Sequence, residues 1–175
     1  MLVESRQPAA RQKGITLSMQ AEPTIIVVDH VADYVQKMID NLLSNALKYT
    51  AEGGTVTLSA RQQGQQLLLT VSDDGQGIHP DDLPHIFEPF YQSRHTSTAP
   101  GTGIGLAFCR EIANASQATI SAKSALGEGT TFTIVMPLRQ RNITTTPTSK
   151  PTTPTPPTND ILPPTRRSYS RRGGG

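Results

Sequence analysis

The sequence has few of the residues that build disulfides, membrane spans or large aromatic cores. It contains no Trp, aromatic residues make up 5% of its 175 residues, and Cys109 is the single cysteine. One cysteine excludes an internal disulfide and a cysteine-based metal cluster, and four scattered His do not indicate a zinc site. No apolar run approaches the roughly 18 residues of a membrane-spanning helix, and the first residues carry no signal segment. We therefore expect a cytoplasmic segment, although a longer parent protein could be membrane-anchored.

Charge and apolar residues are unevenly distributed along the chain. The last 37 residues, from Arg139, hold four apolar side chains, seven Lys or Arg and one Asp, a net charge of +6. The preceding 138 residues carry nine basic and thirteen acidic side chains, a net charge of −4. The basic balance therefore belongs to the tail, and the charge of the rest argues against nucleic-acid binding by a folded domain.

Residues 139–175 are predicted to form a disordered, Thr/Pro-rich basic tail. Thr or Pro occupies sixteen of the twenty-two positions from 144 to 165, a composition that cannot bury a core. A natural linker or a cloning remnant is the first interpretation, and an arm that binds an anionic surface or nucleic acid is the alternative.

Hydrophobic periodicity predicts alternating strands and helices before this tail. Residues 31–49 form one broad apolar face at helical spacing, and 103–115 indicate a second helix. A polar helix end interrupted near Pro8 is expected before residue 14, a short helix over 81–87, and a mobile loop over 88–100. The predicted strands cover 15–19, 24–28, 55–60, 67–72, 118–122 and 130–136. Core packing is predicted for Met19, Met38, Phe108, Cys109 and Met136.

Three polar side chains lie on one face of the first long predicted helix. Asn41, Asn45 and Lys48 follow one another at i, i+4 and i+7. Amide oxygens are suitable ligands for Mg²⁺ bridging nucleotide phosphates, and a lysine one turn later could hold a phosphate. A merely solvated polar face is the alternative.

Two glycine-rich segments follow. Asp73 to Ile78 places a carboxylate at the end of an apolar strand, beside backbone that can approach a flat ligand such as adenine. Pro100 to Ala107 opens a helix, where backbone amides attract anions. It has neither the spacing of the dinucleotide-binding fingerprint nor the Lys of a Walker A loop. A polar turn and a helix start without a ligand are the respective alternatives.

Taken in order, these segments and an aromatic one between them resemble the ATP-binding catalytic domain of sensor histidine kinases. The boxes that carry the resemblance are Asp40–Thr50, Asp73–Ile78, Phe87–Phe90 and Gly101–Leu106. This domain belongs to a superfamily shared with gyrase, a mismatch-repair ATPase and a heat-shock chaperone. The resemblance implies an α/β sandwich, a mixed β-sheet with helices on one face (the Bergerat-type ATP-binding fold), over residues 15–138. Residues 1–14 then resemble the end of a preceding dimerisation helix and its linker.

The resemblance also implies roles for individual residues. Asn45, assisted by Asn41, would bind Mg²⁺, Lys48 would contact phosphate, and Asp73 would accept the adenine amine. Residues 79–100 would be the ATP lid, anchored by Phe87 and Phe90, with Arg94 either a phosphate clamp or a solvated residue. The implied ATP-binding residues are Asn41, Asn45, Lys48, Tyr49, Asp73, Gly75, Gly77, Ile78, Phe87, Phe90, Arg94, Gly101, Thr102, Gly103, Ile104, Gly105 and Leu106.

Departures from the family pattern bear on the activity. Asp74 stands where the family usually has Asn, and Gln92 where many members have Arg. Hydrolases of the superfamily have a Glu at the position of Asn41, and an amide cannot act as a general base. Phosphoryl transfer to a histidine is therefore expected rather than rapid hydrolysis.

The expected partners lie outside the chain. None of its four His is followed by the acidic residue of family acceptors, so a separate dimerisation hairpin must carry the phosphoacceptor. A response regulator would act downstream, and the chain alone is expected to be a monomer. A nucleotide-binding scaffold without phosphotransfer and an anti-sigma-type serine kinase are the alternatives.

Overall fold

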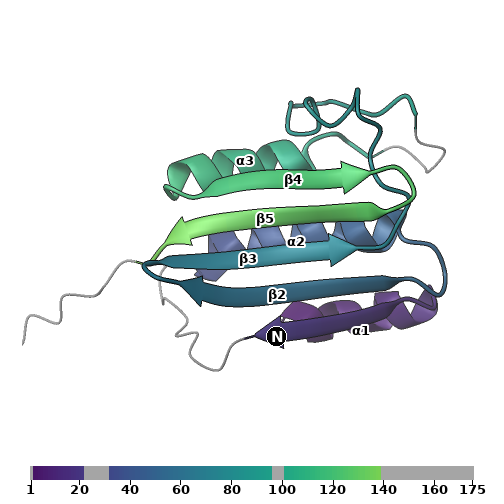
Figure 1. Ribbon diagram of the computed structural model, residues 1–175, viewed down its shortest axis with the longest axis horizontal. Coiled ribbons are helices and arrows are strands. Elements are labelled where there is room, and N and C mark those ends of the chain that lie inside the picture. The colour runs from purple at the N-terminus through teal and green to yellow at the C-terminus, as the bar shows by residue number, and fades with distance from the viewer. Residues whose placement is uncertain (1, 22–31, 96–100, 139–175) are drawn as a thin grey trace, which may run out of the picture. The chain divides into compact units, whose positions relative to one another are not determined.

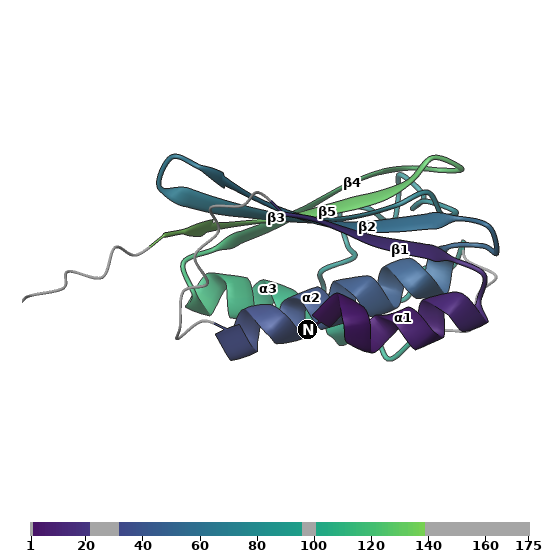
Figure 2. The same ribbon diagram turned by 90° about the horizontal axis from the view of Figure 1, so that it is seen from below.

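The computed structural model describes residues 2–21, 32–95 and 101–138 of the chain, which lie in one compact unit. A five-stranded mixed sheet forms one layer, and three helices cover one of its faces (Figures 1 and 2). The elements in chain order are α1 (Leu2–Gln12), β1 (Thr16–Ala21), α2 (Ala32–Tyr49), β2 (Thr55–Gln63), β3 (Gln66–Asp73), α3 (Gly105–Ala115), β4 (Thr119–Ala125) and β5 (Gly129–Pro137). The predicted α/β sandwich is therefore confirmed.

The order of strands places β3 at the centre of the sheet. The order is β1-β2-β3-β5-β4, with β1 parallel to β2 and the other neighbours antiparallel. Asp73, the last residue of β3, is paired with Val56 on one side and Thr130 on the other. A carboxylate at the end of a central strand is thus held between two neighbours.

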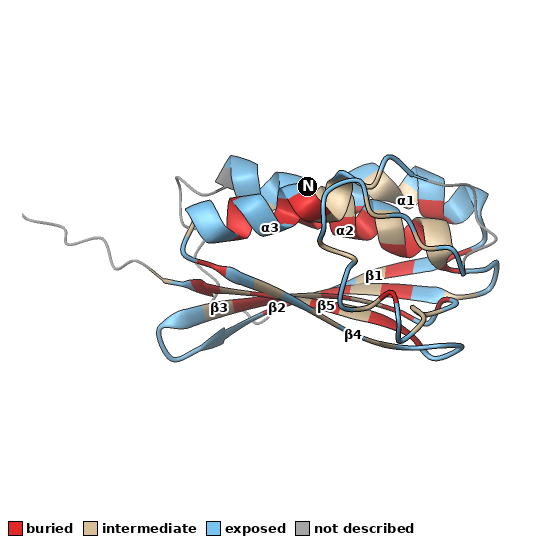
Figure 3. Cartoon of the chain, turned by 90° about the horizontal axis from the view of Figure 1, so that it is seen from above, coloured by how far each residue is buried: buried red, intermediate tan, exposed pale blue. Residues whose placement is uncertain are grey.

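The core fills the space between the helices and the sheet (Figure 3). Residues of α2 at helical spacing point to the sheet because the apolar face of the helix must be removed from water. The largest fully buried side chains are Met38, Leu42, Leu43, Val56, Val71, Cys109 and Ile134.

Three of the five predicted core residues are buried, and two predictions were wrong. Met38, Cys109 and Met136 are at most 7% exposed, whereas Met19 is 52% and Phe108 41% exposed. Met19 lies on β1, an edge strand with a neighbour on one side only. Phe108 lies between buried positions of α3, but successive helical residues point about 100° apart, so its ring faces outward.

The helix α1 continues through Pro8, so the predicted interruption was wrong. Proline removes one helical hydrogen bond, but tertiary contacts hold this helix. Val3 and Ala10 are buried in the core, and Arg6 forms a two-pronged ion pair with Asp40 of α2, at 2.7 and 2.5 Å. Of residues 1–14, assigned from the sequence to the end of a preceding helix and its linker, residues 2–14 form α1 and the turn to β1.

The predicted short helix over 81–87 was also wrong. This segment is a succession of turns, in which backbone N–H groups donate to the carbonyl three positions earlier. These hydrogen bonds run from Asp82 N to His79 O, from His85 N to Asp82 O and from Glu88 N to His85 O. Pro84 has no N–H to donate, which disfavours a continuous helix there. The strand predicted over 24–28 and the tail lie outside the described residues.

Candidate functional site

The polar face of α2 forms one side of the site. Asn41, Asn45 and Lys48 are each half-buried, while the opposite face of the helix packs in the core. Asn41 donates from Nδ2 to the carbonyl of Lys37 at 3.2 Å, so its amide oxygen remains available as an acceptor. Lys48 Nζ lies 5.0 Å from the ring centroid of Tyr49, a cation–π contact that orients both side chains.

Asp73 is buried at the end of β3, and hydrogen bonds hold its carboxylate on one side only. Its Oδ1 accepts from the backbone N–H of Gly75 at 3.0 Å and of Thr130 at 3.3 Å. Burial raises the pKa of Asp73, these two bonds oppose that rise, and the neighbouring Asp74 adds to it. No residue of the described part bonds Oδ2, which leaves that oxygen for an external donor.

The first glycine box is packed between the end of α2 and the turn that joins β4 to β5. The N–H of Gln76 donates to Tyr49 O at 3.1 Å, and the carbonyl of Gln76 accepts from Gly127 N at 2.9 Å. Gly77 has φ +72°, and a Cβ there would lie 1.9 Å from Ala125 O. Only glycine allows this close approach. Next to it, Ile78 N donates to a serine hydroxyl of β4 at 2.8 Å.

The second glycine box faces α2 at the start of α3. A Cβ built on Gly105 would lie 3.3 Å from Asn41 Oδ1, and one on Gly101 would lie 3.5 Å from Lys48 Nζ. The helix begins after Ile104 without a side-chain cap, so its first amides have no side-chain acceptor and can bind an anion. Within this glycine box Thr102 is exposed, and Leu106 at its end packs against the core. Two segments about sixty residues apart are thus in contact.

The two aromatic residues predicted to anchor the lid over residues 79–100 behave differently. Phe87 packs edge-to-face against Phe132 of β5, with ring centroids 6.3 Å apart. The ring of Phe90 is 73% exposed, so the prediction that it anchors the segment was wrong for its side chain. Its backbone supplies the contact instead, since Phe90 N donates to Gly103 O at 2.9 Å. Arg94 is exposed, and its part in phosphate binding stays a prediction.

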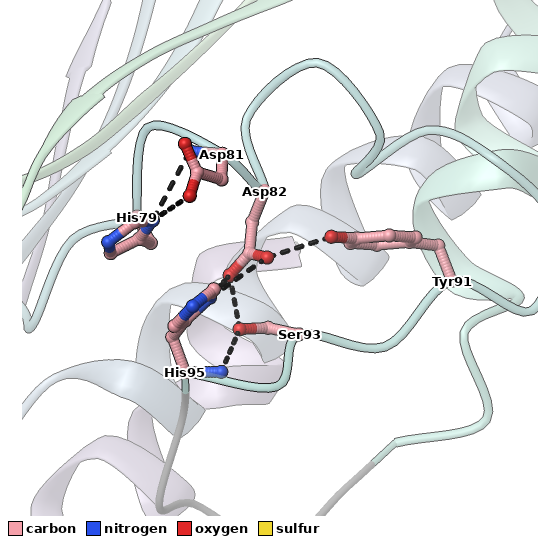
Figure 4. A network of polar contacts seen from close by, with 6 residues as sticks. All are labelled: His79, Asp81, Asp82, Tyr91, Ser93 and His95. Atoms are coloured by element: carbon pink, nitrogen blue, oxygen red, sulfur yellow. Dashed lines mark hydrogen bonds and ion pairs between the residues drawn. The ribbon is translucent and has the colours of Figure 1, made fainter.

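Two aspartates have contacts that sequence reasoning missed. Asp74 Oδ1 accepts from Thr55 N at 2.7 Å and so holds the start of β2. Asp82 is 3% exposed and accepts from Tyr91 Oη at 2.7 Å and from the hydroxyl of Ser93 (Figure 4). Burial alone would raise the pKa of Asp82, but these bonds and His95 outweigh it, and the pKa is lowered. Nothing in the sequence distinguishes Asp82 from its exposed neighbour Asp81.

The site therefore combines neutral oxygens, a cation, helix-start amides and a buried acceptor, which suits a nucleotide with its metal.

A family profile described as histidine kinase-, DNA gyrase B-, and HSP90-like ATPase matches residues 30–140. The chain belongs to this ATPase family. Within the family, its relatives are sensor histidine kinases. It is 36% identical over 130 residues to an uncharacterized sensor-like histidine kinase, R01002, of Rhizobium meliloti strain 1021. This match covers 73% of the chain and 25% of the relative.

A second relative and a solved structure agree with this assignment. The chain is 36% identical over 129 residues to the alginate biosynthesis sensor protein KinB of Pseudomonas aeruginosa, covering 74% of the chain and 21% of KinB. The crystal structure of full-length ShkA in complex with AMPPNP has a TM-score of 0.70 and 28% identity, covering 78% of this chain and 28% of that one. The chain is thus a histidine-kinase-type ATP-binding catalytic domain.

The ATPase-family domain is a part of its relatives' architecture. The chain spans about a quarter of the length of the curated relatives it matches. In the described residues, no helix is both long enough and apolar enough to cross a membrane.

Proposed function

We propose that this chain binds MgATP and transfers the γ-phosphoryl group to a histidine on a dimerisation hairpin outside the chain. The proximity of the Asn41–Lys48 face to the second glycine box supports this most directly. Asn41 Oδ1 lies 3.3 Å from the Cβ position of Gly105, and Lys48 Nζ 3.5 Å from that of Gly101. A metal ligand, a cation and helix-start amides therefore converge where phosphates would lie.

The residues present fit Mg²⁺ and ATP. Mg²⁺ prefers hard oxygen ligands and keeps several waters, and Asn41 has its amide hydrogens turned to Lys37 O and its oxygen toward Gly105. Asn45, one turn later, would be the principal metal ligand. The bound metal would neutralise charge on the phosphates. Asp73 Oδ2 would accept the adenine amine, and Gly75 and Gly77 would let the backbone approach the base.

The remaining proposed contacts surround the nucleotide. Tyr49 and Ile78 would border the base, and Arg94 would approach the phosphates from the segment 79–95. The start of α3 would bind the phosphates through backbone amides, and its glycines would let the phosphates approach the backbone closely. The amides in question belong to Gly101, Thr102, Gly103, Ile104, Gly105 and Leu106.

The amide at position 41 favours transfer over hydrolysis. Asn41 is an amide and cannot take a proton from water at neutral pH. The adjacent carboxylate, Asp40, is held by both of its oxygens in the ion pair with Arg6. A nucleophile with its own activation, such as a histidine on a hairpin, would therefore be required.

The wider organisation is part of the same proposal. Residues 15–138 would be the catalytic domain, 1–14 would lead from the hairpin, and 139–175 would be a tail. The hairpin and a response regulator would be the partners in a two-component phosphorelay in the cytoplasm. Without the hairpin the chain would be a monomer, which light scattering at micromolar concentration would test.

Calorimetric titration of ATP with and without Mg²⁺ tests the nucleotide site. We expect magnesium-dependent binding that Asn45→Ala loses and that Asn114→Ala, an exposed asparagine of α3, retains. The γ-phosphoryl transfer is tested separately by adding a hairpin domain of a sensor kinase and following acid-labile phosphate. Binding without transfer to any hairpin would support a nucleotide-binding scaffold instead. Acid-stable phosphate on a serine-bearing partner would support an anti-sigma-type serine kinase.

A further inference from the structure

Two histidines and an aspartate converge in the segment 79–95 (Figure 4). One ring nitrogen each of His79 and His95 and one carboxylate oxygen of Asp81 all lie within 4.8 Å of one another. The two imidazole rings are stacked, with centroids 4.0 Å apart and an angle of 15° between their planes. Sixteen positions separate the two histidines in sequence, so the turns between them create this proximity.

The buried Asp82 orients one of these histidines. His95 Nδ1 lies 3.2 Å from both carboxylate oxygens of Asp82. Because an ionised carboxylate only accepts hydrogen bonds, Nδ1 is the donor, and the neutral form of the ring presents the lone pair of Nε2 to a metal ion. Tyr91 and Ser93 donate to the same carboxylate and hold it in place. A carboxylate behind a histidine is the usual outer support of a metal-binding imidazole.

The second histidine is oriented by its own neighbour. His79 Nδ1 accepts from Asp81 N at 3.2 Å and lies 3.6 Å from Asp81 Oδ2. A metal ion bound at this nitrogen would take the lone pair that the backbone N–H now uses. Ligand atoms of a tetrahedral zinc ion are about 3.3 Å apart, given bonds of about 2.0 Å. This nitrogen and oxygen are thus nearly at ligand spacing, and the widest pair in the cluster would close by about 1.5 Å.

We propose that His79, Asp81 and His95 bind a divalent transition metal ion, for which Zn²⁺ is the best fit. Two imidazoles and one carboxylate are a common zinc ligand set that leaves a position for water. The three side chains are 30%, 79% and 45% exposed, so an ion can reach them from solvent. The bound ion would join position 79 to position 95 and restrict the segment between them.

This site is distinct from the proposed Mg²⁺ site. Mg²⁺ selects oxygen ligands and phosphates, whereas imidazole nitrogens select zinc and its neighbours in the transition series. Cys109, the other residue type that binds zinc strongly, is fully buried in the core. Zinc binding therefore needs no nucleotide and should persist in excess Mg²⁺.

Calorimetric titration of Zn²⁺ into the nucleotide-free chain, in excess Mg²⁺, tests the proposal. We expect one equivalent to bind, and His79→Ala and His95→Gln each to weaken binding more than about a hundredfold, with Asp82→Asn weakening it about ten- to hundredfold. The Gln amide can still donate to Asp82, so loss of binding there reports the lost imidazole ligand rather than a collapsed segment.

His85→Ala is the matched control, because His85 lies in the same segment but pairs with Glu88 at 2.8 Å. Its zinc affinity should equal that of the unmodified chain. Co²⁺ as a spectroscopic probe should give the visible absorption of a low-coordinate site, and the His79 and His95 variants should lack it. No binding, or binding that His79→Ala and His95→Gln leave unchanged, would overturn the proposal. Equal loss in the His85 variant would overturn it as well.

Discussion

Replacing Asp73 by Asn should separate ATP binding from folding stability. The carboxylate is buried, and both of its hydrogen bonds fall on Oδ1. The amide of Asn can present its own oxygen to Gly75 N and Thr130 N. Only the charge and the second oxygen are then lost, and an NH₂ group takes the place of Oδ2.

The effect on nucleotide binding follows from that exchange. A hydrogen bond to a charged acceptor contributes about 1.5–3 kcal/mol, and the adenine amine would meet a donor in place of an acceptor. The Kd for MgATP should therefore rise about ten- to hundredfold. Calorimetry at neutral pH in excess Mg²⁺ measures it directly.

The effect on stability has the opposite sign. The pKa of Asp73 is raised mainly by burial, so the folded chain holds this proton more tightly than the unfolded chain. The stability linked to the protonated form is fully present below the ordinary pKa and is lost as the pH rises through the folded one. At neutral pH the charged carboxylate therefore opposes folding, and Asp73→Asn should be at least as stable as the unmodified chain in urea.

A neighbouring carboxylate supplies the control. Asp74→Asn keeps an oxygen acceptor for Thr55 N and changes an exposed charge, so the Kd should change by no more than about fivefold. Unaltered ATP affinity in Asp73→Asn would refute its role at adenine. A variant that lost both affinity and stability would show that the carboxylate is needed for the fold instead.

Three further predictions concern the fold around the site. Gly77→Ala should lower the free energy of unfolding by about 3 kcal/mol or more, because a positive φ and a clash with Ala125 O combine, whereas Gly64→Ala, with a similar φ and open space, should cost about 1 kcal/mol. Equal losses in urea denaturation would contradict this. Leu43→Ala should lower the free energy of unfolding by about 2–5 kcal/mol, because it leaves a cavity under α2. A loss below about 1 kcal/mol in the same assay would contradict this. Because the pKa of Asp82 is lowered in the folded chain, its ionised carboxylate stabilises the segment 79–95 when the pH is above the ordinary pKa of aspartate. That stability is lost as the pH falls through the lowered pKa of the folded chain. Amide NMR signals of the segment should show this acid transition, and an identical transition in Asp82→Asn would rule the carboxylate out.

Local patterns in the sequence determined much of this protein. The spacing of apolar residues predicted the helices α2 and α3, and short apolar segments predicted the strands β2 and β3, because each pattern depends on the period of its own side chains. The asparagine, glycine and phenylalanine boxes also pointed to the family before any contact was visible. Each box is a short segment whose residue types suit one part of a nucleotide, so it can be read without knowing the fold.

Tertiary structure alone decided which of these segments meet. Gly105 faces Asn41 because α3 packs beside α2, a contact across sixty-four positions that no local pattern encodes. Met19 and Phe108 are exposed because an edge strand and an outward helix face leave them uncovered. Asp82 and Asp81 are adjacent and chemically identical, yet one is buried among three donors and the other faces solvent. Burial and partners depend on how distant elements pack, and that is the information that a one-dimensional pattern of residue types lacks.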